Sequence, residues 1–205
     1  MNIRSQVLIT SIVLTLLSSC ISGQGNHVWK KIKWIDAWLA SPSCNPPCWE
    51  GVTPGKTTLD QAYVILNTNP QILNATKETN YVAWSFQPKN DGGSGLIFSE
   101  NNDLIEVISL RPRNGIISLG ETIEKFGEPD QVLFTASDSD IVITYLVYSK
   151  KGMALVLSLS NTSTRRISSN EDILGIDLFV PGYDFSGFEL TMIVSETKWI
   201  GYSIY

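Results

Sequence analysis

Two cysteines four positions apart are the residues of this 205-residue chain whose types and spacing most invite chemistry. Cys44 and Cys48 flank a double proline in "SCNPPCWEG", and Trp49 follows directly. Such a pair can form a structural disulfide, remain as free or metal-bound thiols, or act as a redox dithiol. Dedicated thiol oxidoreductases place two residues between their cysteines at the start of a helix, whereas here three intervene and a turn follows. The spacing favours a structural disulfide and leaves the other two readings open.

Residues for other common reactions are scarce. His27 is the only histidine and precedes the main body of the chain, so a Ser-His-Asp or Cys-His arrangement has no base there. Asp138 and Asp140 in "SDSD" lack the glycine and downstream glutamate of a calcium loop. The glycines of "NDGGSG" lack the lysine and following helix of a phosphate loop. We therefore expect no enzyme activity, no cofactor and no metal site.

Composition describes a folded, acidic protein. Hydrophobic residues make up 43% of the chain and charged residues 17%, which is typical of a globular domain. The net charge is −5, and only the lysines between positions 30 and 33 cluster. Because this balance repels phosphate, nucleic acid is not an expected partner.

The amino terminus has the pattern of an export signal. Arg4 precedes an apolar run from Val7 to Leu17, which is too short to span a bilayer as a helix. The run ends in "LSSC", Leu17 to Cys20, which resembles the lipobox of bacterial lipoproteins. That resemblance implies removal of residues 1–19 as a signal peptide and a palmitate-type anchor on Cys20. The alternative is an ordinary secretory signal in which Cys20 is incidental.

This anchor would hold the protein on the extracytoplasmic side of the cell membrane or outer membrane. Thiols tend to oxidise there, so the compartment strengthens the disulfide interpretation of Cys44 and Cys48. Residues 20–40 form a tether in which Val28, Ile32, Ile35 and Leu39 follow one helical stripe. This amphipathic helix either lies on the membrane or packs on the domain.

The rest of the chain contains two similar halves, residues 58–113 and 114–182, after a Cys-clamped turn at 41–57. Each half starts with a capping-box pattern, Thr58 to Gln61 and Ser118 to Glu121, and each helix ends near a proline. Three β-branched and aromatic runs follow each helix. We predict an α+β fold of two helix-strand-strand-strand repeats, an antiparallel sheet with helices on one face. Residues 183–205 are expected to add two strands that cover an edge.

The halves resemble a known lipoprotein family. The stretches "GVTPGKTTLDQAYVIL" and "LGETIEKFGEPDQVLF", with the strands that follow them, are similar to the BamE/SmpA fold. Two tandem copies also resemble the architecture of beta-lactamase inhibitor proteins. The segment "SCNPPCWEGVTPGKTT" is similar to uncharacterised bacterial lipoproteins with a C-x-x-P-C-W-x-G motif. BamE itself has one repeat and no such cysteine pair, so its role in barrel assembly does not transfer.

These features predict a membrane-anchored, non-catalytic protein-binding or scaffold module of the cell envelope. The partner would be a protein of unknown identity, bound through the sheet face or a groove between repeats. One alternative is an inhibitor of a secreted hydrolase, with "FTASDSD" as the plug and Phe134, Asp138 and Asp140 as contacts. A second is a thiol-dependent envelope enzyme. Trp49 is either a recognition residue or, as its position beside Cys48 favours, a core residue under the first helix.

Overall fold

The computed structural model describes residues 44–87, 92–100, 104–112, 117–136, 141–160, 166–182, 193–203 and 205. The chain divides into two units, Met1–Lys30 and Lys31–Tyr205, and every described residue belongs to the second. The predicted signal peptide, Cys20 and the tether helix lie outside the described residues.

Two helices begin at the predicted capping boxes. Helix α3 spans Leu59–Thr68, and the Thr58 hydroxyl accepts from the Gln61 amide while the Gln61 side chain accepts from the Thr58 amide. Helix α4 spans Leu119–Phe126, and Ser118 and Glu121 make the same reciprocal pair. Each box satisfies backbone donors that the first helical turn leaves without partners, which fixes where the helix starts.

Four strands follow each helix. After α3 come β1 (Ile72–Lys77), β2 (Tyr81–Phe86), β3 (Gly93–Phe98) and β4 (Val107–Pro112). After α4 come β5 (Gln131–Ala136), β6 (Ile141–Tyr148), β7 (Met153–Ser160) and β8 (Ile173–Phe179), with the short helix η3 (Ser149–Lys151) between β6 and β7. We call α3 with β1–β4 the first half and α4 with β5–β8 the second half.

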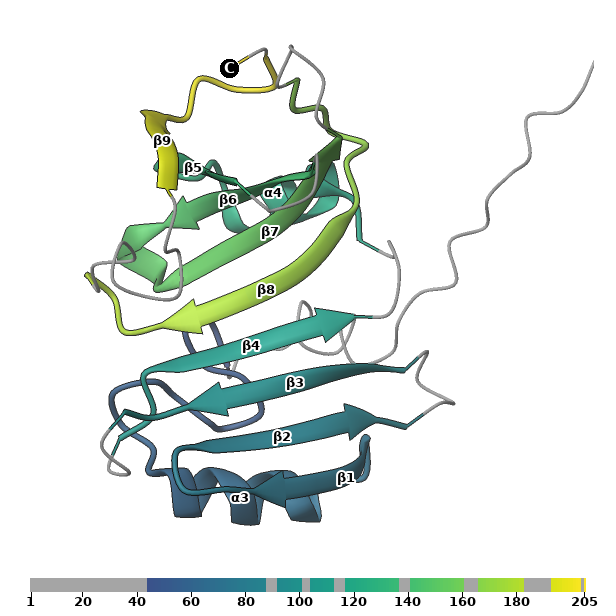
Figure 1. The fold of residues 1–205 in the computed structure, drawn as a ribbon, viewed down its shortest axis with the longest axis vertical. Coiled ribbons are helices and arrows are strands. Elements are labelled where there is room, and N and C mark those ends of the chain that lie inside the picture. The colour runs from purple at the N-terminus through teal and green to yellow at the C-terminus, as the bar shows by residue number, and fades with distance from the viewer. Residues whose placement is uncertain are drawn as a thin grey trace, which may run out of the picture. The chain divides into compact units, whose positions relative to one another are not determined.

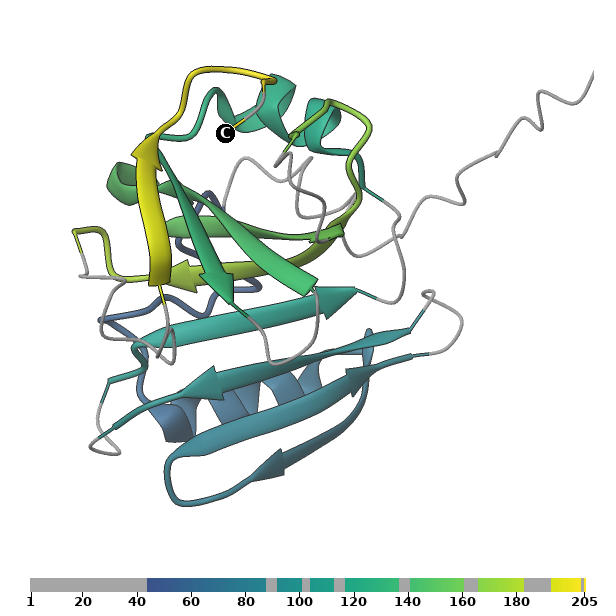
Figure 2. The same cartoon turned by 45° about the horizontal axis from the view of Figure 1, so that its top comes forward.

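All strands in the described part of the chain belong to one antiparallel sheet, which has nine strands. Figure 1 shows their arrangement. Their order is β1-β2-β3-β4-β8-β7-β6-β5-β9, so the halves meet where β4 pairs with β8. Strand β9 (Ile193–Lys198) pairs with β5 and closes that end of the second half, and Figure 2 shows the two side by side. The sheet therefore continues from one half into the other without a break.

Both helices pack on the same face of this sheet. In Figure 1 they lie behind the strands, and in Figure 2 α3 is visible behind the first half. One cluster of buried side chains joins Leu59 and Leu66 of α3, Leu119 of α4 and inward residues of both halves. A smaller cluster lies on the other face, made of Val107, Leu133, Val147, Ala154 and Phe179.

The N-caps of the two helices also contact the sheet in corresponding places. Thr58 forms an isolated antiparallel bridge with Leu104, just before β4. Ser118 forms one with Asp172, just before β8. The start of each helix is thus tied to the start of the fourth strand of its own half.

The α+β class and the antiparallel sheet are as predicted, but the strand count differs. Each helix is followed by four strands instead of the three predicted, because residues 72–77 and 131–136 also form strands. Of the two strands expected within residues 183–205, one is present as β9, whereas residues 201–203 form bends.

Candidate functional site

The cysteine pair forms the predicted disulfide. The sulfur atoms of Cys44 and Cys48 are 2.12 Å apart, and the Cys48 amide donates to the Asn45 carbonyl at 2.9 Å. This small closed loop leads directly into Trp49, whose backbone forms a two-bond bridge with Val52. The disulfide therefore fixes the approach of the chain to the core.

Trp49 lies in that core, with 1% of its surface exposed. Its ring stacks on Trp84 of β2, with centroids 5.2 Å apart and planes 14° apart, and meets the edge of Phe86. This placement agrees with packing and leaves Trp49 no surface for a partner. A recognition role for Trp49 therefore has no geometric support.

The predicted plug loop begins inside a strand. Phe134 belongs to β5, is 1% exposed, and its ring centroid lies 6.1 Å from that of Tyr205. Phe134 is thus a packing residue rather than an exposed contact. Asp138 and Asp140 lie outside the described residues.

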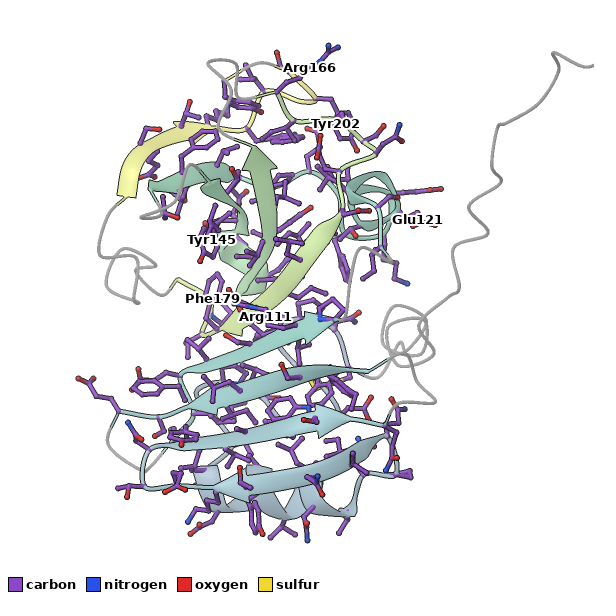
Figure 3. The ribbon with its side chains drawn as sticks, turned by 45° about the vertical axis from the view of Figure 1, so that its right-hand side comes forward. Arg111, Glu121, Tyr145, Arg166, Phe179 and Tyr202 are labelled. Carbon is purple, nitrogen blue, oxygen red and sulfur yellow. A yellow bond between two sulfur atoms is a disulfide. The ribbon has the colours of Figure 1, made fainter. Side chains whose placement is uncertain are left out.

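The junction between the halves holds a charged pair that no motif of the sequence indicates. Arg111 of β4 donates to both carboxylate oxygens of Asp177 of β8, at 2.6 and 3.2 Å. The Asp177 side chain is only 3% exposed, whereas that of Arg111 is 40% exposed. We call this junction, the β4–β8 pairing with its Arg111–Asp177 pair, the seam. Figure 3 labels Arg111 on β4, next to β8.

A glycine makes room for the arginine at the seam. A Cβ atom on Gly175 would lie 2.5 Å from Nη1 of Arg111 and 2.9 Å from its Cδ. The Arg111 side chain therefore lies flat over the backbone of β8 and reaches Asp177 two residues further along. A side chain at position 175 would force it away.

On strands β2–β4 of the first half, the face that points away from the helices is open to solvent at β2 and β3 and closes toward the seam, where Val107 is buried. In β2, the residues Val82, Trp84 and Phe86 are buried toward the helices, so the alternate residues face the other way. The same alternation holds in β3 and β4. We call this set the open face: Tyr81, Ala83, Ser85, Ser94, Leu96, Phe98, Val107, Ser109 and Arg111.

Cross-strand register orders the open face into rows that run into the seam. Tyr81 pairs with Phe98, which pairs with Val107 and then with Phe179 of β8. In the next row Leu96 lies between Ala83 and Ser109, and Ser109 pairs with Asp177. Leu96 is 40% exposed, whereas Val107 and Phe179, next to the seam, are buried.

The seam has only a faint sequence signal. Arg111 and Asp177 are 66 positions apart, so no local spacing joins them. Each is a charged residue within an otherwise apolar strand. Because charged residues are seldom buried without a partner, this feature alone could have indicated that the two form a pair. Their pairing requires knowledge that β4 and β8 are neighbours.

Within the described ranges, no three or more His, Cys, Asp or Glu residues are grouped so as to hold a metal ion. No helix among those residues is both long and apolar enough to cross a membrane. Comparison of the chain with protein-family models, with curated proteins and with solved structures gave no match.

Proposed function

We propose that the chain is a lipid-anchored protein of the cell envelope whose folded part binds a protein partner and catalyses no reaction. The open face carries this proposal. It contains one charged residue among nine, Arg111, and the carboxylate of Asp177 already neutralises that charge. The centres of protein interfaces are depleted in charge and enriched in aromatic residues and arginine. Tyr81, Phe98 and Arg111 match this pattern, whereas the Ser and Ala residues of the open face do not.

The shape of the open face supports the same conclusion. Small side chains surround Leu96, namely Ala83, Ser109, Ser85 and Ser94. Because these side chains stand low on the sheet, another protein can approach closely and cover Leu96, Tyr81 and Phe98 together. A sheet face that meets only solvent ordinarily carries polar residues, and the exposed Leu96 with Tyr81 and Phe98 departs from that pattern.

The anchor part of the proposal rests on the amino-terminal sequence. The apolar run Val7–Leu17 followed by Cys20 supports export and acylation. The Cys44–Cys48 disulfide fits such a location, because disulfides persist outside the cytoplasm. The lipid would hold the open face near other envelope proteins.

We also infer that the two halves are copies of one BamE/SmpA-like unit. Three correspondences support this inference: the capping box at each helix start, the bridge from each N-cap to the start of the fourth strand, and the four antiparallel strands in each half. Each half alone would leave its fourth strand as an open edge, and pairing β4 with β8 removes both edges.

Partner capture from solubilised membranes tests the binding proposal. The full-length chain is compared with Leu96→Asp on the open face and with Val64→Asp on the exposed side of α3, where Val64 is 61% exposed. Both variants add one negative charge at an exposed apolar position. We expect Leu96→Asp to lose the captured protein and Val64→Asp to retain it. Equal capture by both variants would refute binding through the open face.

Metabolic labelling with palmitate tests the anchor separately. We expect label in the wild-type chain and none in Cys20→Ser, with Cys48→Ser still labelled. Wild-type protein that takes up no label and keeps its first twenty residues would contradict the anchor.

A further inference from the structure

Strand β1 forms one edge of the sheet, at the outer end of the first half (Figure 1). The Glu78 amide donates to the Tyr81 carbonyl at 2.9 Å, so the pair that closes the β1–β2 hairpin is hydrogen-bonded. Along antiparallel strands, hydrogen-bonded and non-hydrogen-bonded pairs alternate. Thr76 therefore bonds to β2, whereas the backbone N–H and C=O groups of Ala75 and Lys77 point away from β2.

These outward groups have no strand to pair with. Within the described part of the chain, the sheet places no strand beyond β1, and the side-chain bond from Gln87 to the Ile72 carbonyl lies at the start of β1. Asn74, Thr76 and Lys77 are exposed. Because the outward donors and acceptors recur at strand spacing, a second extended backbone is the group that matches all of them.

The two edges of the sheet differ in how they are protected. Strand β9, at the opposite edge, exposes Glu196 and Lys198, and charged side chains on an edge strand discourage pairing with another chain. Strand β1 has one charged residue, Lys77, and the carboxylate of Asp60 in α3 holds its ammonium group. Leu73 of β1 is also 49% exposed. The β1 edge is therefore the one that is open to another strand.

We propose that this edge pairs with the same edge of a second copy of the chain, antiparallel and about a two-fold axis at Thr76. In that register Ala75 of each copy lies opposite Lys77 of the other, and the two residues exchange N–H to C=O hydrogen bonds. All four outward groups of each copy are then satisfied, because the two-fold axis gives every donor an acceptor. This self-pairing goes beyond the proposed binding of an envelope protein and does not depend on it.

The neighbouring registers are less favourable. An axis at Lys77 would set two ammonium groups directly opposite each other, and like charges in that position are destabilising. An axis at Ala75 would need the backbone of Leu73, where a register shift interrupts the pairing of β1 with β2. The axis at Thr76 avoids both problems and sets two threonine side chains opposite each other, which is a favourable cross-strand pair.

This pairing joins the open faces of the two copies. Thr76 lies beside Ala83, which lies beside Leu96, on the side of the sheet that points away from the helices. The row therefore continues across the axis, and the two Leu96 side chains belong to one surface. A single strand pair is small beside the about 1,200–2,000 Å² that stable complexes bury, so we expect a weak, reversible dimer. Copies anchored in one membrane would meet at a high local concentration, which favours such a contact.

Cysteine trapping in membranes from expressing cells tests the pairing and its register. In a non-hydrogen-bonded pair the Cα atoms are about 4.5 Å apart, within the range of about 4.4–6.8 Å that disulfides accept. Thr76→Cys should therefore form a covalent dimer under mild oxidation. Asn74→Cys, also exposed, lies about 14 Å from its own copy in this register and should give about fivefold less dimer. The wild type measures the background from the native cysteines.

A mixed sample tests the register itself. Asn74 lies opposite Glu78 of the second copy, so a tagged Asn74→Cys chain and an untagged Glu78→Cys chain should form a disulfide with each other. Equal dimer from Thr76→Cys and Asn74→Cys, or none above the wild type, would overturn the proposal. A Thr76→Cys adduct with a different protein would show that the edge takes a strand of another chain, which would overturn it as well.

Two variants separate the pairing from the fold. Ala75→Pro removes an outward N–H and leaves the bonds to β2 intact, and proline is tolerated at such edge positions. In the Thr76→Cys background we expect it to lower the dimer about fivefold with little change in thermal stability. Thr76→Lys, which sets two like charges opposite each other, should lower self-association in detergent as measured by sedimentation. Unchanged association in both variants would contradict the pairing.

A final control separates this proposal from capture through the open face. Leu96→Asp with Thr76→Cys should form as much covalent dimer as Thr76→Cys alone, because Leu96 lies two strands away from β1. Loss of the dimer in this variant would mean that the contact runs through Leu96 and would overturn pairing at the β1 edge. Failure of either proposal can therefore be recognised independently of the other.

Discussion

The two halves share their elements but differ in the face that points away from the helices. In the first half this face exposes Leu96 to 40%, with Tyr81 and Phe98 half-buried beside it. On the same side of the second half, Leu133 and Val147 are 3% and 2% exposed. This side of the sheet therefore holds a second core cluster in the second half and at Val107 beside the seam, and an accessible surface at β2 and β3. This difference locates the proposed binding surface.

The halves also complete their cores from opposite ends of the chain. In the first half, Trp49 arrives from upstream and stacks on Trp84. In the second half, Trp199 arrives from downstream and stacks on Tyr205 at 6.0 Å. A disulfide fixes the upstream segment, whereas pairing of β9 with β5 fixes the downstream one. Neither half is complete with its helix and four strands alone.

The largest expected loss of stability comes from Gly95→Ala in the first half. A Cβ atom there would lie 2.0 Å from the Trp84 ring, and that ring is held by Trp49 on one face and by the edge of Phe86. Because these contacts restrict how far the Trp84 ring can move away from the added methyl group, we expect a loss of about 3 kcal/mol or more in the free energy of unfolding. Urea denaturation measures it.

Gly120→Ala in α4 is the matched change in the second half. Its Cβ would lie 3.2 Å from the Ser169 carbonyl oxygen, a contact that a small shift relieves. Alanine also favours the helix over glycine by about 1 kcal/mol. We expect a net change below about 1 kcal/mol, and equal losses at both glycines would show that Trp84 is not tightly held.

The next effect concerns the seam. Asp177→Ala removes the buried partner of Arg111 and leaves a gap in the sheet, so we expect a loss of about 2 kcal/mol. Asp60→Ala removes the partner of Lys77 on the surface of the first half, where the Asp60 side chain is 80% exposed, and should cost less than about 0.5 kcal/mol. Chemical denaturation of both variants gives the contrast. A seam variant as stable as the surface variant would mean that the pair does not join the halves.

Removal of the disulfide is expected to cause a smaller loss of stability. Replacing Cys44 and Cys48 together by serine releases a short loop, which on the chain-entropy model costs about 2 kcal/mol, and less where prolines already stiffen the loop. We expect a loss of about 1–2 kcal/mol and faster hydrogen exchange around Trp49, with exchange around Trp199 unchanged. Uniform acceleration in both regions would contradict a local clamp.

Tyr148→Phe is expected to change the free energy of unfolding least at neutral pH. The substitution instead alters how that free energy depends on pH. Burial first, and then nearby charges, raise the pKa of Tyr148 above its ordinary value of 10.0. The unfolded chain loses this proton near pH 10 while the folded chain keeps it, so stability is complete below about pH 10 and falls as the pH rises further. Between about pH 9 and pH 11 the wild type should lose about 1 kcal/mol more than the variant. Denaturation across this range measures the difference, and an equal loss in the wild type and the variant would contradict the assignment to Tyr148.

Local features of the fold were predictable from sequence because their causes are local. Capping boxes at Thr58 and Ser118 define helix starts within four residues, and the cysteine spacing favours a disulfide. Strands β1 and β5 were missed because each follows a helix within a few residues of a proline, Pro70 or Pro129, where the sequence reads as a helix exit.

The seam and the open face depend on nonlocal pairing. The two halves join edge to edge through the pairing of β4 with β8. No spacing along the sequence predicts that these two strands are neighbours. Phe134 was expected in a loop because its strand was not recognised, and its burial follows once β5 lies between β6 and β9. Exposure of Leu96 likewise follows only from the side on which the helices pack.

Photo-crosslinking in intact cells tests the central claim most directly. Benzoylphenylalanine replaces Leu96 on the open face in one strain and Val64 on α3 in another, because both positions are exposed and apolar. We predict that light joins the Leu96 variant to one discrete envelope protein and leaves the Val64 variant without that adduct. The same adduct from both positions, or from Val64 alone, would contradict the account.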